Sequence, residues 1–119
     1  MAWIKASREV IGELRHKVQI VTEEPDLQES YGVTLGQAES ADWLLSEAER
    51  DGVIDLFLFA DEVAEMLAGE ADDAATVARD RAKDANRNGD KVAGRAEQRL
   101  ARDLEKLRDE IEAMQEAAQ

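Results

Sequence analysis

Carboxylate side chains gather between residues 61 and 73, on a predicted helix in the middle of the chain. Spacings of three and four residues put several of them on one helix face, as in the metal-binding carboxylate sites of helical bundles. Such sites also need Glu-x-x-His pairs on facing helices. The one histidine, His16, lies between Arg15 and Lys17 in a different predicted helix. A solvated acidic face is therefore predicted here, with no bound metal.

A second set of oxygen-bearing side chains runs from Asp84 to Asp90. Its first, third and fifth positions are Asp, Asn and Asn, and its sixth is glycine, which matches the opening of a calcium-binding EF-hand loop. The twelfth position, where that loop needs a bidentate glutamate, is Arg95. Because Asn, Asp and Gly also favour tight turns, the segment is interpreted as a helix–helix turn that binds no metal.

Neither nucleophilic catalysis nor phosphate transfer has a matching motif. The serines have no histidine near them in sequence, and no Gly-rich segment ends in Gly-Lys-Ser/Thr. The absence of cysteine excludes disulfides and thiolate metal sites. The chain is therefore not expected to be an enzyme, and no catalytic residue or cofactor is assigned to it.

Aromatic side chains supply the candidate interaction residues. Only five aromatic residues stand among twenty alanines, so the core is expected to be thin. Residues 56–60 are apolar on every side of a helix, so part of this segment must contact more than one neighbour. The core is expected to hold Leu45, Phe57 and Leu58. Exposed aromatic residues often mark contacts between proteins, and the candidates for a subunit interface are Trp3, Trp43, Phe57 and Phe59.

The net charge of −13 is unevenly distributed. Residues 31–70 hold one basic and ten acidic side chains, a net −9, whereas residues 71–119 hold ten basic and twelve acidic ones, a net −2. An acidic middle beside a balanced end argues against direct binding to nucleic acid, which requires a basic face. The acidic segment indicates either a basic partner or adaptation to high salt.

Apolar residues at three- and four-residue steps predict a first helix that begins near Trp3. Residues 18–21 could continue this helix or form a short strand. Pro25 ends either structure, because proline disfavours helix in the residue before it. A loop is predicted over residues 26–33.

Thr34 and Gln37 match a capping box, which predicts a second helix that runs to about Arg50. The third helix is predicted over about residues 53–86, and the fourth over about residues 90–117. The predicted fold class is therefore all-α with four helices. Residues 1–62 would form a small helical base, and residues 63–119 a projecting antiparallel hairpin, with the third helix continuous across that boundary.

The last two helices have complementary apolar faces. Paired outward from the turn, eight layers of apolar residues are each centred on Gly89. In most layers a small alanine faces a large aliphatic side chain, which lets two helices approach closely and interdigitate. The predicted seam consists of Ala71, Ala74, Ala78, Ala82, Leu100, Leu104, Leu107 and Ile111.

No apolar segment is long enough to cross a membrane or to act as a signal peptide, so a soluble cytoplasmic or virion protein is expected. The function expected is that of a non-enzymatic assembly or interaction subunit, plausibly virus-encoded, that forms a homo-oligomer or docks on a larger assembly. An acidic inhibitor that mimics DNA and blocks a nucleic-acid-binding protein is the alternative, and a calcium-dependent binding module the third.

Overall fold

Capping side chains mark where three of the helices begin. In the computed structural model, which describes residues 3–118, Ser7 Oγ accepts a hydrogen bond from Val10 N at 3.2 Å. Thr34 Oγ1 accepts from Gln37 N at 3.1 Å, and Gln37 Oε1 accepts from Thr34 N at 2.9 Å, so the predicted capping box is confirmed. Asp90 Oδ1 accepts from Ala93 N at 3.0 Å. These bonds satisfy backbone donors that a helix start leaves free.

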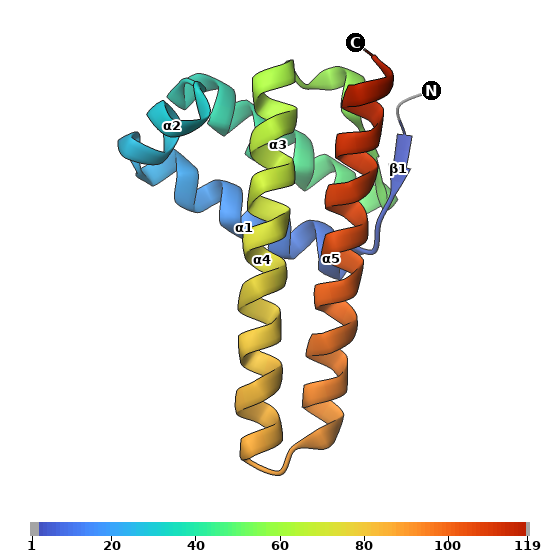
Figure 1. Ribbon diagram of the computed structural model, residues 1–119. Helices are drawn as coiled ribbons and strands as arrows, with labels where there is room; N and C mark the ends of the chain where they lie inside the picture. The colour runs from blue at the N-terminus through green and yellow to red at the C-terminus, as the bar shows by residue number, and fades with distance from the viewer. Residues whose placement is uncertain (1–2, 119) are drawn as a thin grey trace.

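The all-α class is confirmed, but the described part of the chain contains five α-helices rather than four, together with a two-stranded sheet (Figure 1). In order, the elements are β1 (Trp3–Lys5), α1 (Arg8–Glu23), α2 (Pro25–Tyr31), α3 (Leu35–Asp51), β2 (Val53–Asp55), a 3-10 turn η1 (Leu56–Leu58), α4 (Asp61–Arg87) and α5 (Lys91–Ala117).

The predicted helix start near Trp3 is wrong, because residues 3–5 form β1 and α1 begins at Arg8. β1 pairs antiparallel with β2, and Ile4 lies opposite Ile54. Both isoleucines are buried, whereas Trp3 and Lys5 on either side are exposed. Alternate residues of a strand point to opposite faces, so this pairing sends one side chain of β1 inward. Residues 18–21, left open between helix and strand, belong to α1.

The loop predicted over residues 26–33 is also wrong in its first part. Pro25 ends α1 as expected, but it is also the first residue of α2. Proline suits that position because its missing N–H would have no partner there and its φ already fits a helix. Gly32 then ends α2 with a φ of 69°, a left-handed conformation that glycine adopts without strain.

The third predicted helix begins eight residues too early. Gly52, at φ 70°, ends α3, and its carbonyl accepts a hydrogen bond from Ala6 N at 3.0 Å. The chain then enters β2 and η1, where Asp55 Oδ1 accepts from Phe57 N at 3.1 Å. α4 starts only at Asp61. Pairing with β1 and the Asp55 cap thus displace the helix that local composition favours.

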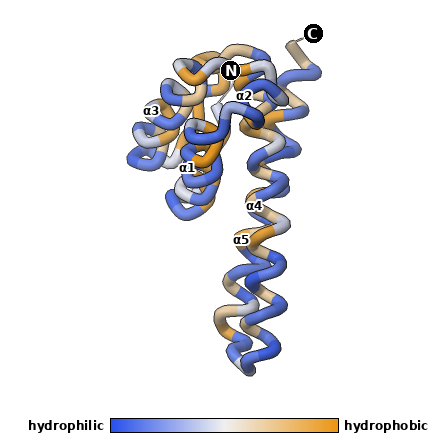
Figure 2. The backbone as a smooth tube through the Cα atoms, turned by 90° about the vertical axis from the view of Figure 1, so that its left-hand side faces the viewer, coloured by the Kyte–Doolittle hydropathy of each residue, from blue (hydrophilic) through white to orange (hydrophobic). Residues whose placement is uncertain are grey.

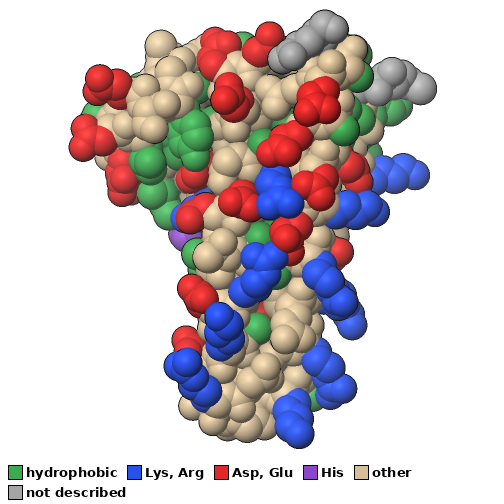
Figure 3. Space-filling view, viewed as in Figure 1, with side chains coloured by type: hydrophobic (Ala, Val, Ile, Leu, Met, Phe, Trp, Pro, Cys, Tyr) green, Lys and Arg blue, Asp and Glu red, His purple; other side chains and the backbone are tan. Residues whose placement is uncertain are grey.

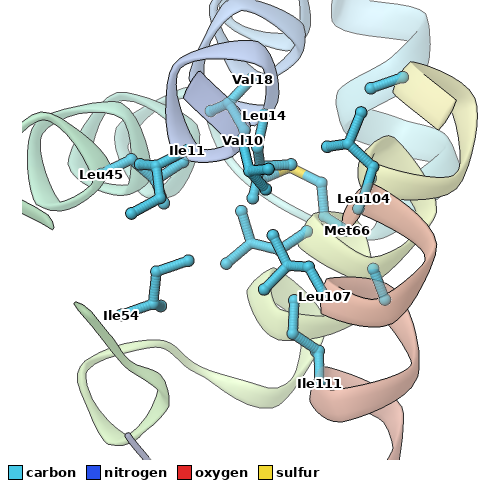
Figure 4. Close-up of a cluster of buried hydrophobic side chains, with 14 of the residues drawn as sticks. Val10, Ile11, Leu14, Val18, Leu45, Ile54, Met66, Leu104, Leu107 and Ile111 are labelled. Carbon is cyan, nitrogen blue, oxygen red and sulfur yellow. The ribbon is translucent and has the colours of Figure 1, made fainter. Parts of the chain in front are cut away.

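One continuous core joins the N-terminal elements, from β1 to η1, to helices α4 and α5. Side chains of α1, α3 and β2 converge on those of α4 and α5 (Figure 4), and every labelled residue is buried. Polar contacts reinforce this packing. Arg81 on α4 donates to Glu13 on α1 at 3.1 Å and to Glu97 on α5 at 3.0 Å, so it joins three helices. The described part of the predicted base, residues 3–62, therefore shares a core with the half of α4 and α5 that is farther from the Gly89 turn.

Helices α4 and α5 lie side by side (Figure 1). Helices α1–α3 form a head beside the proximal half of α4 and α5, which is the half nearer Asp61 and Ala117 (Figure 1). Seen from the side, the distal half, which ends at the Asn88–Gly89 turn, extends beyond the head (Figure 2). The longest dimension of the molecule is 44 Å. All eight seam residues are buried. Arg81 and Glu97, which pair across the helices, are equally far from Gly89 in sequence.

The layer-by-layer register of the seam can be tested by crosslinking. The change Ala78→Cys with Leu100→Cys should give rapid disulfide formation within one chain, because these residues are predicted to face each other. Ala78→Cys with Ile111→Cys is the matched control, since Ile111 lies about 16 Å further along the helix axis and a disulfide needs Cα atoms within about 7 Å. Non-reducing electrophoresis measures the outcome. Crosslinks formed only between chains would show that the helices pair intermolecularly.

Candidate functional site

An apolar groove lies where α3, the small sheet and η1 meet. Its volume is about 520 Å³. Eight apolar and three acidic residues line it: Trp3, Trp43, Leu44, Glu47, Ala48, Asp51, Val53, Ile54, Asp55, Leu58 and Phe59. A second hollow shares Leu44, Leu58 and Phe59, and it continues along α3 past Ser40 and Gly36 to Val63 on α4. We refer to the residues lining the first hollow as the head groove.

The head groove brings together three of the four predicted interface residues. Trp3 and Trp43 are 61% and 62% exposed, and Phe59 is partly buried against the core. Phe57, the fourth, is 77% exposed on η1 and does not line the groove. The expectation that Phe57 and Leu58 belong to the core is wrong, whereas Leu45 is buried as expected. Phe57 and Leu58 are exposed because η1 takes the place of the predicted helical turn and directs both side chains outward.

Carboxylates form one edge of the head groove. Glu47 and Asp51 lie one turn apart on α3, and Asp55 lies opposite Trp3 in the sheet. Glu39 lines a further hollow beside Trp43. No basic residue is among the described residues that line these hollows. An apolar floor beside carboxylates can bury apolar side chains of a partner and pair with its lysines or arginines.

The calcium-like segment takes a different shape from a metal-binding loop. Asp84 and Asn86 lie within α4, which continues to Arg87, so their side chains project from a regular helix. Asp84 lies 3.5 Å from Arg87, and Asp90 caps α5. Gly89, at φ 81°, makes the turn. Over residues 3–118 no group of three potential metal-ligating side chains is placed to hold an ion.

The acidic cluster of residues 61–73 is divided among structural contacts. Asp72 pairs with Arg108 on α5, and Asp73 pairs with Lys17 on α1. Glu70 is buried, and its Oε2 accepts a hydrogen bond from Tyr31 Oη at 2.6 Å. Burial raises the pKa of Glu70 despite that hydrogen bond and the nearby Lys17. Glu70 and Asp73 thus hold the head against the hairpin, whereas Asp72 links α4 to α5.

Sequence reasoning missed the groove residues that are not aromatic, chiefly Leu44, Val53 and Leu58. Leu58 had one signal, the uninterrupted apolar character of residues 56–60, but that pattern favours a helix. Leu44 and Val53 lie outside that segment. The groove exists because β2 and η1 replace that helix and leave a hollow beside α3.

No known protein family, characterised protein or solved structure is significantly similar to this chain. Among residues 3–118, no helix combines the length and apolar character needed to span a membrane. Any assignment of function therefore depends on the chemistry of the surface itself.

Proposed function

We propose that the protein is a non-enzymatic interaction subunit that uses the head groove to dock a protein segment with apolar side chains flanked by Lys or Arg. The observation that carries this proposal is the position of both tryptophans of the chain, Trp3 and Trp43, exposed at one apolar groove with an acidic edge. Exposed tryptophan is enriched at protein interfaces, where it contributes much of the binding energy.

The charge of the groove favours docking on a different protein over pairing with a second copy. In a two-fold dimer the same patch contacts itself. Such a contact would place Glu47, Asp51 and Asp55 of one copy against the same carboxylates of the other, and juxtaposed like charges oppose association. Of the two expectations, homo-oligomer or docking on a larger assembly, we therefore favour docking. A virion setting stays an expectation from composition, because the fold favours no source.

Tryptophan fluorescence provides a direct test. Both tryptophans are exposed at the groove, so burial by a bound segment should shift their emission to shorter wavelength. An amphipathic 18-residue helix of Leu and Lys should produce this shift, and the same helix with Glu replacing Lys should not, because the groove edge is acidic. If neither peptide, or only the Leu/Glu peptide, shifts the emission, the proposed partner chemistry is wrong.

Trp43→Ala should weaken Leu/Lys peptide binding by about thirtyfold, equivalent to about 2 kcal/mol for a central interface aromatic. Helix content measured by circular dichroism should stay unchanged, because Trp43 is largely exposed. Calorimetry measures the affinity of this variant. Val92→Ala, which trims an exposed apolar side chain outside the groove, is the control and should bind normally. Phe59 is a poorer probe, because it also packs on the core.

The alternative function, an acidic inhibitor of a nucleic-acid-binding protein, is supported by the carboxylates of residues 31–70. It predicts that neutralising Glu39, Glu47, Asp55 and Glu62 abolishes binding, while Trp43→Ala changes little. Glu62 accepts a hydrogen bond from Gln37 Nε2 at 2.8 Å. Its own backbone N–H and this amide lower the pKa of Glu62. A steep loss of affinity with salt would favour the inhibitor.

A further inference from the structure

Basic side chains concentrate on the distal half of the hairpin. Residues 79–102 hold eight basic and four acidic side chains, a net +4, although the whole chain carries −13. Figure 3 shows Lys and Arg along both helices toward the turn, whereas Asp and Glu dominate the head. The net −2 of residues 71–119 conceals this basic end, because Asp72, Asp73 and the acidic residues 103–119 offset it. The expectation that no basic face exists depended on that net charge.

The cations form two rows along the helices. On α4, Arg79, Lys83 and Arg87 recur every four residues, so they lie on one face at steps of about 6 Å. On α5 a second row extends over about 16 Å along the helix axis, and it consists of Lys91, Arg95, Arg99 and Arg102.

A shallow groove of about 290 Å³ lies between the two rows. Its walls are Arg79 and Lys83 from α4 and Gln98 and Arg102 from α5. Two buried alanines, Ala82 and Ala101, also line it. The small alanine side chains leave room for a ligand to approach between the two rows of cations.

Most of these cations have no carboxylate partner. Among the described residues, Lys83, Lys91, Arg95, Arg99 and Arg102 form no ion pair. Of the two paired members of the rows, Arg79 contacts Glu105, and Arg87 contacts Asp84. The charges of five side chains are thus available to a ligand.

The nearby acids point elsewhere or are already engaged. Asp80, Asp84 and Asp103 come one position after Arg79, Lys83 and Arg102, about 100° around the helix from them. Glu97 accepts from Arg81, and Asp90 caps α5. The second hollow, next to the head groove, reaches α4 at Val63, and Lys83 lies about 30 Å further along the helix axis. Carboxylates at the level of Val63 are thus several Debye lengths from Lys83 at physiological salt and are largely screened there. Glu13 of α1 comes closer to the cations, but it is paired with Arg81.

We infer that the distal hairpin binds the phosphate backbone of nucleic acid without reading its sequence. Evenly spaced cations on both sides of a narrow groove suit a chain of regularly spaced negative charges. Gln98 is the one amide side chain among the described residues that line the groove. The groove therefore offers few side chains that could recognise base edges. Two rows of cations on neighbouring helices suit a linear polyanion better than a flat anionic membrane. This surface is distinct from the head groove, so it does not depend on the proposed function.

Fluorescence anisotropy with labelled 20-base-pair duplex and 20-nucleotide single-stranded DNA tests the inference. Saturable binding of either DNA in 50 mM salt is expected. The logarithm of the association constant should fall with the logarithm of salt concentration with a slope of about −3 to −4, as for four phosphate contacts. Absence of saturable binding to both DNAs would overturn the inference.

The double variant Lys83→Gln/Arg102→Gln should weaken DNA binding at least about tenfold and make the salt slope shallower by about two. The control Lys5→Gln/Arg8→Gln removes the same charge from two exposed cations that form no ion pair among the described residues. Equal loss in both variants would overturn the inference. The inference would also be wrong if the protein sedimented with anionic phosphatidylserine vesicles but did not bind DNA. Tryptophan emission should stay constant on DNA binding, which separates this site from the head groove.

Discussion

Replacing Leu104 with alanine is expected to lower the free energy of unfolding by about 3–4 kcal/mol, within the range for fully buried leucines. Leu104 on α5 has no exposed surface and lies in the cluster with Met66 of α4 and Leu14 of α1 (Figure 4). Ala74, its predicted partner across the seam, is too small to fill the cavity that the change leaves. Native domains are stable by about 5–15 kcal/mol, so this loss is a large share of the total.

Urea denaturation followed by circular dichroism measures the effect of the Leu104 change. The midpoint should fall while the denaturant dependence stays constant, because the change leaves the surface exposed on unfolding nearly the same. Val92→Ala on the same helix is the matched control. Its side chain is 73% exposed, so its loss should cost less than about 0.5 kcal/mol. A cost below about 1 kcal/mol for Leu104→Ala would mean that α1 does not pack on α5 as described.

The second large effect is expected from Tyr31→Phe, which should lower stability by about 1–3 kcal/mol at neutral pH. Tyr31 Oη donates to Glu70 Oε2, and Glu70 is 5% exposed, so the variant leaves a buried carboxylate without its hydrogen-bond donor. Gly69 is part of the same contact, because a Cβ there would lie 2.9 Å from Tyr31 Oη. Gly69→Ala should therefore also destabilise the protein, although alanine is the better helix former.

Both groups of this contact give stability a characteristic pH dependence. Burial, with help from the Glu70 hydrogen bond and charge, raises the pKa of Tyr31 above its ordinary 10.0. The folded state thus retains the phenol proton more tightly than the unfolded state. Stability from Tyr31 is fully present below pH 10 and is lost as pH rises above it. Burial likewise raises the pKa of Glu70 above its ordinary 4.5, so stability from Glu70 is lost as pH rises from about 4.5 through that raised value.

Thermal melts between pH 4 and pH 11 measure this dependence. Tyr31→Phe should remove the alkaline loss, because no titrating phenol remains at the contact. Glu70→Gln should remove the loss that begins near pH 4.5, and its amide oxygen can still accept from Tyr31. Identical alkaline profiles for the Tyr31 variant and the unmodified protein would show that this tyrosine titrates normally in the folded state.

Local sequence patterns were sufficient to predict the helical class and those helix ends that depend on neighbouring residues. The capping box of Thr34 and Gln37, the stop at Gly52 and the turn at Gly89 each depend on residues within one helical turn. Such signals are strong because both partners of each hydrogen bond are close in the chain. The burial of the eight named seam residues of α4 and α5 was likewise predictable, since helical periodicity repeats over many turns. The pattern fails outside the named seam, where Ala60, Ala96 and Ala118 are exposed.

Only the tertiary structure decided where segments far apart in the chain meet. β1 and β2 are three residues each, too short for a period-two pattern, and the contact of Ile4 with Ile54 across some fifty residues makes them strands. The groove at Trp3 and Trp43, the Tyr31–Glu70 contact and the two rows of cations have the same origin. Each depends on which helix faces which, and side-chain packing in three dimensions determines that, whereas local sequence does not.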